Sequence, residues 1–174
     1  MKQKKLLMSL ATLISSSHRK ETIMRERVEN INIENAKLMF KNFSGKNDRF
    51  NPGRRNFSVI IEDEETALAL KDEGWNIKTY QHDPEEPVIY RLEVRIKWEP
   101  FRPTIWMITE SGGKTLLNED TIDTLDDAEI KNVDIVIRPY VWEMGGNSGI
   151  AAYVKTMYVT IVEDVFAAKY RDID

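Results

Sequence analysis

The chain contains 174 residues, of which 41% are hydrophobic and 31% are charged, and its net charge is −4. This length suits a single domain, and no apolar run reaches the ~18 residues that a membrane-spanning helix needs. The lack of cysteine excludes disulfides and thiolate metal sites, and the two histidines leave little scope for histidine chemistry. The negative net charge excludes a uniformly basic nucleic-acid binder, but it permits a basic groove on an acidic body.

The first 24 residues differ from the rest in composition. Met1–Lys5 is basic, Leu6–Ile14 is apolar and Ser15–Ser17 has small side chains, which is the outline of a secretory signal peptide. Two alternatives stay open, an upstream extension of the true start and a frayed amphipathic helix. We expect the segment 1–24 to be an N-terminal extension, disordered or not native, and residues 1–23 to be dispensable for folding and binding. Residues 25–174 are expected to form one domain.

The next part of the chain has mainly β patterns. Strand-like stretches within 28–43 are interrupted by a bend, and the polar segment 44–53 is expected to be a loop. Residues 54–61 form the next strand, with alternate apolar side chains on one face. A short helix follows, because Asp63 is placed to cap free N–H groups and Gly74 is placed to end the helix.

The clearest strand is 88–98, which follows a weaker one at 75–80. Its apolar residues alternate with Arg91, Glu93, Arg95 and Lys97, so one face is buried and the other is wet and basic. A turn then leads to a strand over 104–109.

The last third of the chain predicts one short helix and a long hairpin. Acidic residues begin the helix, which is expected over 118–128. Residues 133–143 and 150–163 flank the glycine-rich segment 145–149, a pattern typical of a hairpin. Five or six strands with one or two short helices indicate a mainly β fold, a small and partly open barrel. A two-layer sandwich is the alternative.

Signals for catalysis are weak. The segment 112–115 resembles the end of a phosphate-binding loop, but Ile108 stands where the motif requires a glycine, so we interpret the segment as a turn. The acids of 119–129 suit Mg²⁺ in type, as in a nuclease, but their pattern is typical of a solvated helix. His82 lies alone in an acidic loop. We therefore expect no catalytic residue, no metal and no cofactor, and predict that the chain is not an enzyme.

Cations gather in three places: the loop 46–55, the wet face of the strand 88–98, and the last hairpin. Aromatic rings accompany them in the loop and in the hairpin. Such a mixture suits single-stranded nucleic acid, because cations meet phosphates and flat rings stack on bases. In the alternative interpretation the rings cover a second apolar layer and the cations pair with acids. The candidate residues are Lys46, Arg49, Phe50, Arg54, Arg55, Arg91, Arg95, Lys97, Arg138, Tyr140, Trp142, Tyr153 and Lys155.

The hairpin part of this surface depends on the turn. A turn of two or four residues is expected to pair residue 140 with 153 and residue 138 with 155, which puts rings and cations side by side on one face. A turn of three or five residues shifts the parity and splits the surface.

Several stretches resemble the small single-stranded DNA-binding proteins encoded in the replication modules of tailed bacteriophages. They are Asn32–Phe43 continuing to Lys46, Arg55–Phe57, Gly74–Lys78, Ile137–Tyr140 and Ala152–Val159. The resemblance covers roughly residues 28–170 and implies an oligonucleotide-binding (OB) barrel without a cofactor that coats DNA during replication or recombination. Two features depart from it: the end of the chain, 169–174, is less acidic than the tails common in such proteins, and the N-terminal extension has no counterpart.

We predict an OB-like domain that binds and protects single-stranded DNA without strong sequence preference, in phage DNA replication or recombination. The expected partners are single-stranded DNA and replication or recombination proteins, with a homo-oligomer as an option and no membrane, in the cytoplasm of the host cell. The alternative is a β-sandwich interaction module that binds protein or sugar without enzymatic activity. A metal-dependent nuclease that uses the acids of 119–129 is the third option.

Overall fold

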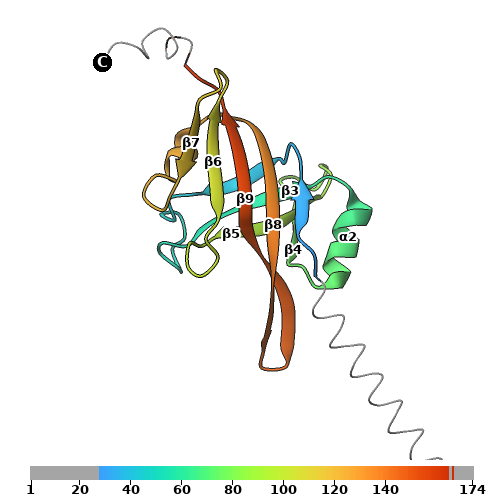
Figure 1. The fold of residues 1–174 in the computed structure, drawn as a ribbon. Helices are drawn as coiled ribbons and strands as arrows, with labels where there is room; N and C mark the ends of the chain where they lie inside the picture. Colours follow the sequence, from blue (N-terminus) through green and yellow to red (C-terminus); the bar gives the residue numbers. More distant parts are fainter. Residues whose placement is uncertain (1–27, 165, 167–174) are drawn as a thin grey trace, which may run out of the picture.

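The computed structural model describes residues 28–164 and residue 166, and in this part of the chain nine strands form one connected sheet (Figure 1). The strands are β1 (Ile31–Ile33), β2 (Leu38–Asn42), β3 (Arg55–Ile61), β4 (Ile77–Tyr80), β5 (Ile89–Ile96), β6 (Thr104–Thr109), β7 (Lys114–Leu117), β8 (Ile130–Met144) and β9 (Asn147–Ile161), and the helices are α2 (Glu64–Glu73) and α3 (Thr124–Asp127). The predicted extension 1–24 and the end of the chain, 169–174, lie outside the described residues, so the predicted domain boundary stays a prediction.

Strand β9 is the centre of the sheet. It pairs with β8 along one edge, and its other edge pairs first with β5 and then with β6, both in parallel. The path β1–β8–β9–β5–β3–β2 ends in two strands that do not pair with each other, so the sheet stays open. In Figure 1, β3 and β5 run across the direction of β8 and β9, which gives the sheet its barrel-like curvature. The predicted mainly β fold class, with a partly open and barrel-like sheet, is confirmed.

The core lies on the inner face of this curved sheet. Alternate residues of β3, β5, β8 and β9 point inward, as the period of two in their sequences predicts. The largest fully buried side chains are Phe43, Phe57, Leu92, Ile105, Ile122, Leu125, Ile137 and Met157. Inward burial of these residues fixes which side chains remain on the outer face, and the site is built from that outer set.

Helix α2 has the ends that the sequence predicts. The Asp63 carboxylate accepts the backbone N–H of Thr66 at 2.8 Å, and hydrogen bonds from the Thr66 hydroxyl and amide lower the pKa of Asp63. Gly74 ends the helix with φ = 106°, a left-handed conformation that glycine adopts without steric cost.

The structure differs from the sequence-based expectation between residues 112 and 128. The turn at Gly112 and Gly113 is present, and it joins β6 to β7, a short strand that the sequence analysis missed. The expected helix over 118–128 shrinks to the four residues of α3, because the Asn118 side chain accepts the N–H groups of Asp120 and Thr121 and holds turns instead. Short strands such as β1, β4 and β7 raise the number above the expected five or six.

Candidate nucleic-acid interface

The turn of the β8–β9 hairpin decides which side chains share a face. Gly145 and Gly146 form a two-residue turn, both with positive φ, and Arg138 pairs with Tyr153 while Tyr140 pairs with Ala151. The even turn puts rings and cations on one face, but the predicted pairs 140–153 and 138–155 are wrong. The predicted pairs require a turn centred between residues 146 and 147, whereas the observed turn is centred between Gly145 and Gly146. Each of these β8 residues therefore pairs with a β9 residue two positions earlier in the chain than predicted. A bulge then leaves Lys155 without a direct cross-strand partner in β8.

Three rings pack together at the base of this hairpin. Phe101, from the loop between β5 and β6, stacks on Tyr153 with ring centroids 4.3 Å apart, and Tyr140 meets both rings edge-on at 5.8 and 6.0 Å. Arg138 donates a hydrogen bond to the Phe101 carbonyl at 3.1 Å, and its guanidinium lies 6.0 Å from the Phe101 ring. A guanidinium is thus fixed beside a platform of rings.

The parallel pairing of β5 with β9 connects this cluster to the basic strand. Arg95 is the register partner of Tyr153, and Val94 is the partner of the buried Ala152. Neighbouring partners in a sheet point to the same side, so Arg95 and Tyr153 share the outer face. The wet side of β5 therefore continues directly into the aromatic cluster.

Glu93 gathers the cations of β5 and its neighbours. Its side chain is only 12% exposed, and its carboxylate accepts a hydrogen bond from Lys78 at 2.8 Å, forms an ion pair with Arg54, and lies 3.5 Å from Arg95. Burial raises the pKa of Glu93, but the Lys78 hydrogen bond and the charges of Lys78, Arg54 and Arg95 outweigh it and lower the pKa to about 2. Glu93 is therefore ionised at neutral pH and holds three cations around one negative charge.

We call this continuous surface the basic-aromatic face. It consists of Arg54, Lys78, Arg91, Glu93, Arg95, Phe101, Arg138, Tyr140 and Tyr153. Five cations stand against one carboxylate within it, and Asp48 adds a second carboxylate at 3.9 Å from Arg54. The face is positive although the whole chain carries −4. A local field of this sign attracts phosphate.

The other predicted residues take no part in the contacts that define this face. Arg55 turns away and binds the side chain and carbonyl of Glu119. Lys46, Arg49 and Phe50 lie in the exposed loop before β3, where Phe50 is 94% exposed. The remaining three are placed as follows: Lys97 is exposed just after β5, Lys155 is exposed at the bulge of β9, and Trp142 lies farther out on the hairpin with its ring over Gly149.

Sequence reasoning missed Lys78 and Phe101 and did not foresee the role of Glu93. Lys78 is the register partner of Arg91, but the sequence of β4 alone does not reveal which strand it meets. Phe101 lies between two prolines in a turn, and a single ring there carries no periodic signal. Glu93 is the one acid on an otherwise basic strand face, and this exception is the sequence feature that could have indicated its role in holding the cations.

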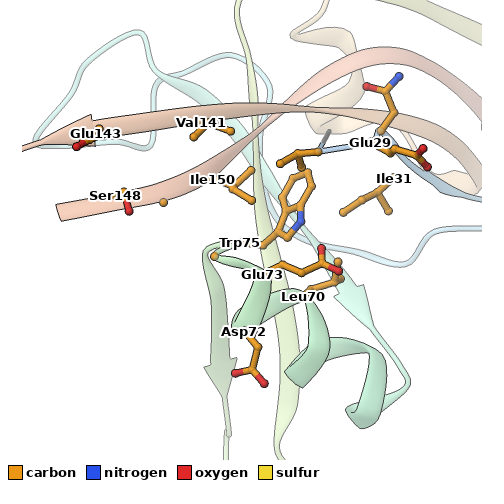
Figure 2. Close-up of a pocket in the computed structure, with 14 residues that line it drawn as sticks. Glu29, Ile31, Leu70, Asp72, Glu73, Trp75, Val141, Glu143, Ser148 and Ile150 are labelled. Atoms are coloured by element: carbon orange, nitrogen blue, oxygen red, sulfur yellow. The ribbon is translucent and has the colours of Figure 1, made fainter. Parts of the chain in front are cut away.

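A hollow of about 1040 Å³ lies between α2 and the outer half of the β8–β9 hairpin, away from the basic-aromatic face (Figure 2). Figure 2 shows Trp75 between the helix and the hairpin, with Leu70 and Ile150 nearby. Its acidic residues are Glu29, Asp72, Glu73 and Glu143. Carboxylates repel phosphate, so the charge of this hollow does not favour a nucleic acid.

Two of the acids that prompted the nuclease option, Glu119 and Asp126, have structural partners. Asp126 accepts the backbone N–H groups of Phe43 and Ser44, each at 2.8 Å, and so fixes the end of β2. Among residues 28–164 and 166, no group of three or more histidine or acidic side chains is arranged to hold a metal ion. In the same part of the chain, no helix is long and apolar enough to cross a membrane.

A family model described as "Putative phage ssDNA-binding domain" matches residues 20–174, and the chain belongs to this family. No curated protein matches the sequence. A single-stranded DNA-binding protein from bacteriophage Enc34, solved in complex with ssDNA, is 16% identical with a TM-score of 0.47, over 78% of this chain and 88% of the other. The protein gp2.5 encoded by bacteriophage T7, a single-stranded DNA-binding protein, is 8% identical with a TM-score of 0.38, over 80% of this chain and 96% of the other.

Proposed function

We propose that the chain binds single-stranded DNA along the basic-aromatic face, without strong sequence preference, during phage DNA replication or recombination. Membership of the phage ssDNA-binding domain family supports this function. Arg54, Lys78, Arg95 and Arg138 meet phosphates, and bases stack on the rings of the aromatic cluster. We also propose that the loop residues Lys46, Arg49 and Phe50, and Lys155 beside the cluster, extend the contact with the strand.

One observation supports the proposed location of the DNA-binding surface: Arg95 and Tyr153 are register partners where β5 pairs with β9. This pairing joins a cationic surface to a cluster of rings with no intervening element. Stacking on an aromatic ring contributes roughly 1–3 kcal/mol per base and tolerates any sequence, because every base has a flat face. Phosphate contacts add a term that weakens with salt. Both terms are independent of sequence, as coating a strand requires.

We further propose that the protein has no enzymatic activity and acts in the cytoplasm of the host cell, with replication or recombination proteins as further partners. The hydrogen bonds that occupy Asp126 support a structural role for this acid. The proposed function needs side chains that bind DNA, and it needs no catalytic residue.

The test is a fluorescence titration of the full chain with oligothymidine, with a duplex of equal length as the control. Stacking near Trp142 and the aromatic cluster is expected to quench protein emission, and the affinity for the single strand is expected to exceed that for the duplex. Equal affinity for both, or no saturable quenching, would contradict the proposal. Cleavage of a labelled strand in Mg²⁺ but not in EDTA would contradict the lack of enzymatic activity.

A further inference from the structure

An exposed ring lies at the opposite end of the basic-aromatic face from the aromatic cluster. Phe40 belongs to β2 and is 51% exposed, at a point where the register between β2 and β3 shifts. Its φ of 52° is in the left-handed region, which is unusual for a bulky residue. A strained backbone that presents a large apolar side chain to solvent is costly to the fold, and such strain concentrates where a residue serves binding.

The surroundings of Phe40 hold its ring in place. The Arg91 guanidinium lies 5.0 Å from the ring centroid, and the Tyr80 ring meets Phe40 edge-on at 5.2 Å. Arg91 is itself fixed by a 2.9 Å hydrogen bond to the Ser58 hydroxyl. A ring held on two sides loses little conformational entropy when a flat ligand stacks on it.

A hollow of about 210 Å³ opens beside this ring. Its lining residues are Phe40, Asn56, Phe57, Ser58, Arg91 and Glu93. Asn56 contributes a carboxamide, which has two donors and an acceptor, and Ser58 contributes a hydroxyl. Polar groups of this kind complement the edge of a nucleobase, while the Phe40 ring complements its flat face.

We propose that this hollow is a second nucleobase subsite, in which a base stacks on Phe40 with its edge toward Asn56 and Ser58. The proposal rests on the proposed function, because the strand must also occupy the aromatic cluster. One subsite lies on β2 and the other on β8 and β9, with β3 and β5 between them. Three spacings between adjacent strands, from β2 to β9, amount to about 14 Å along the sheet. Arg91, Arg95 and the cations around Glu93 lie along this path and meet the phosphates between the two bases.

The experiment measures the affinity of the full chain for oligothymidines of increasing length, from about three to about ten nucleotides. In the unsubstituted protein, affinity is expected to rise steeply once the strand spans both subsites. Phe40→Leu keeps an apolar side chain but removes the flat ring. It is expected to weaken binding of long strands by roughly 5- to 150-fold, and binding of the shortest strands, which still occupy the aromatic cluster, by no more than about twofold.

Tyr158→Leu is the matched control. Tyr158 is also an exposed ring, but it lies at the other end of β9, opposite Asp134. Its replacement is expected to leave the affinity for every length within about twofold.

The outcomes separate the two proposals. If the unsubstituted protein binds no oligothymidine, the proposed function fails. If it binds, and Phe40→Leu matches it at all lengths, the subsite is wrong while the function stands. Phe40→Trp provides a second test that does not depend on the leucine variant folding: long strands are expected to quench the added emission and the shortest strands to quench it less. Equal quenching by all lengths, or none, overturns the subsite.

Discussion

Glu93 is a carboxylate in the middle of a surface that is proposed to bind anions. Its attraction to Arg54, Lys78 and Arg95 offsets the repulsion among these three cations and holds them in one arrangement. The net charge of this group of four remains positive. Glu93 therefore acts as a positioning residue, since it orders the cations and leaves an excess charge for phosphate.

Replacing Glu93 tests this role through the pH dependence of stability. The folded-state pKa of about 2 lies below the ordinary 4.5, so ionised Glu93 stabilises the fold above about pH 4.5 and this contribution disappears as pH falls toward 2. Glu93→Gln is expected to lower the free energy of unfolding at pH 7, and the gap to the unsubstituted protein is expected to close as pH falls through that window. Denaturant titrations at pH 7, 4 and 2.5 measure the gap.

Glu99→Gln is the control for that series. Glu99 is an exposed carboxylate whose ion pair with Arg102 spans 3.5 Å. Exposed pairs contribute about 0–1 kcal/mol, so little change is expected at any of the three pH values. A gap for Glu93→Gln that persists unchanged at pH 2.5 would show that its effect is not electrostatic.

Arg138 tests the phosphate contacts. Arg138→Gln keeps a side chain that can hydrogen-bond the Phe101 carbonyl but removes the charge. Loss of one phosphate contact is expected to flatten the slope of log affinity against log salt by roughly 0.7. Binding isotherms at four salt concentrations give the slope, and an unaltered slope would remove Arg138 from the phosphate path.

Tyr153 tests stacking, and its expected signature is different. Tyr153→Leu removes a ring that stacks on Phe101 but no charge. Affinity for oligothymidine is expected to fall by roughly 1–3 kcal/mol, while the salt slope stays as in the unsubstituted protein. A thermal melt monitors folding. A change of slope without loss of affinity would contradict the stacking role.

At the scale of elements, the loop before β3 depends on a close approach of two glycines. A Cβ atom on Gly45 would lie 2.8 Å from the backbone of Gly53, whereas a Cβ atom on Gly53 would meet nothing within 4 Å. Both residues have positive φ, so each alanine variant carries the left-handed strain of roughly 1–2 kcal/mol. Gly45→Ala is expected to destabilise the protein by more than Gly53→Ala, as measured by denaturant unfolding. Equal losses would show that the loop shifts freely to make room.

Sequence patterns predicted those elements whose signals are local. The alternation in β5, the caps at Asp63 and Gly74, and the glycines of the β8–β9 turn are each read from a few consecutive residues. The basic-aromatic face was only partly predictable, because it depends on which strands become neighbours. The contact between Phe101 and Tyr153 and that between Lys78 and Glu93 follow from strand order and register, and neither is encoded within a single segment.

At the scale of the whole molecule, the binding groups belong to the chain itself. The positive field of the basic-aromatic face comes from arginine and lysine, so affinity is expected to be unchanged by EDTA and by ATP and to fall steeply with salt. Titrations with oligothymidine in each condition measure this. A dependence on a divalent cation would show that a group other than these side chains contributes to binding.

The junction of β5 with β9 has a consequence for the order in which the protein matures. Arg95 and Tyr153 are 58 residues apart in sequence, and two register pairs join their strands. Contacts of such separation form slowly, because bringing the two strands together costs the entropy of closing a long loop. A chain that has not yet added β9 lacks Tyr153 and the pairing that joins this ring to Arg95. The basic-aromatic face is therefore incomplete in an unfinished chain, and we expect such a chain to bind a single strand more weakly than the complete fold does.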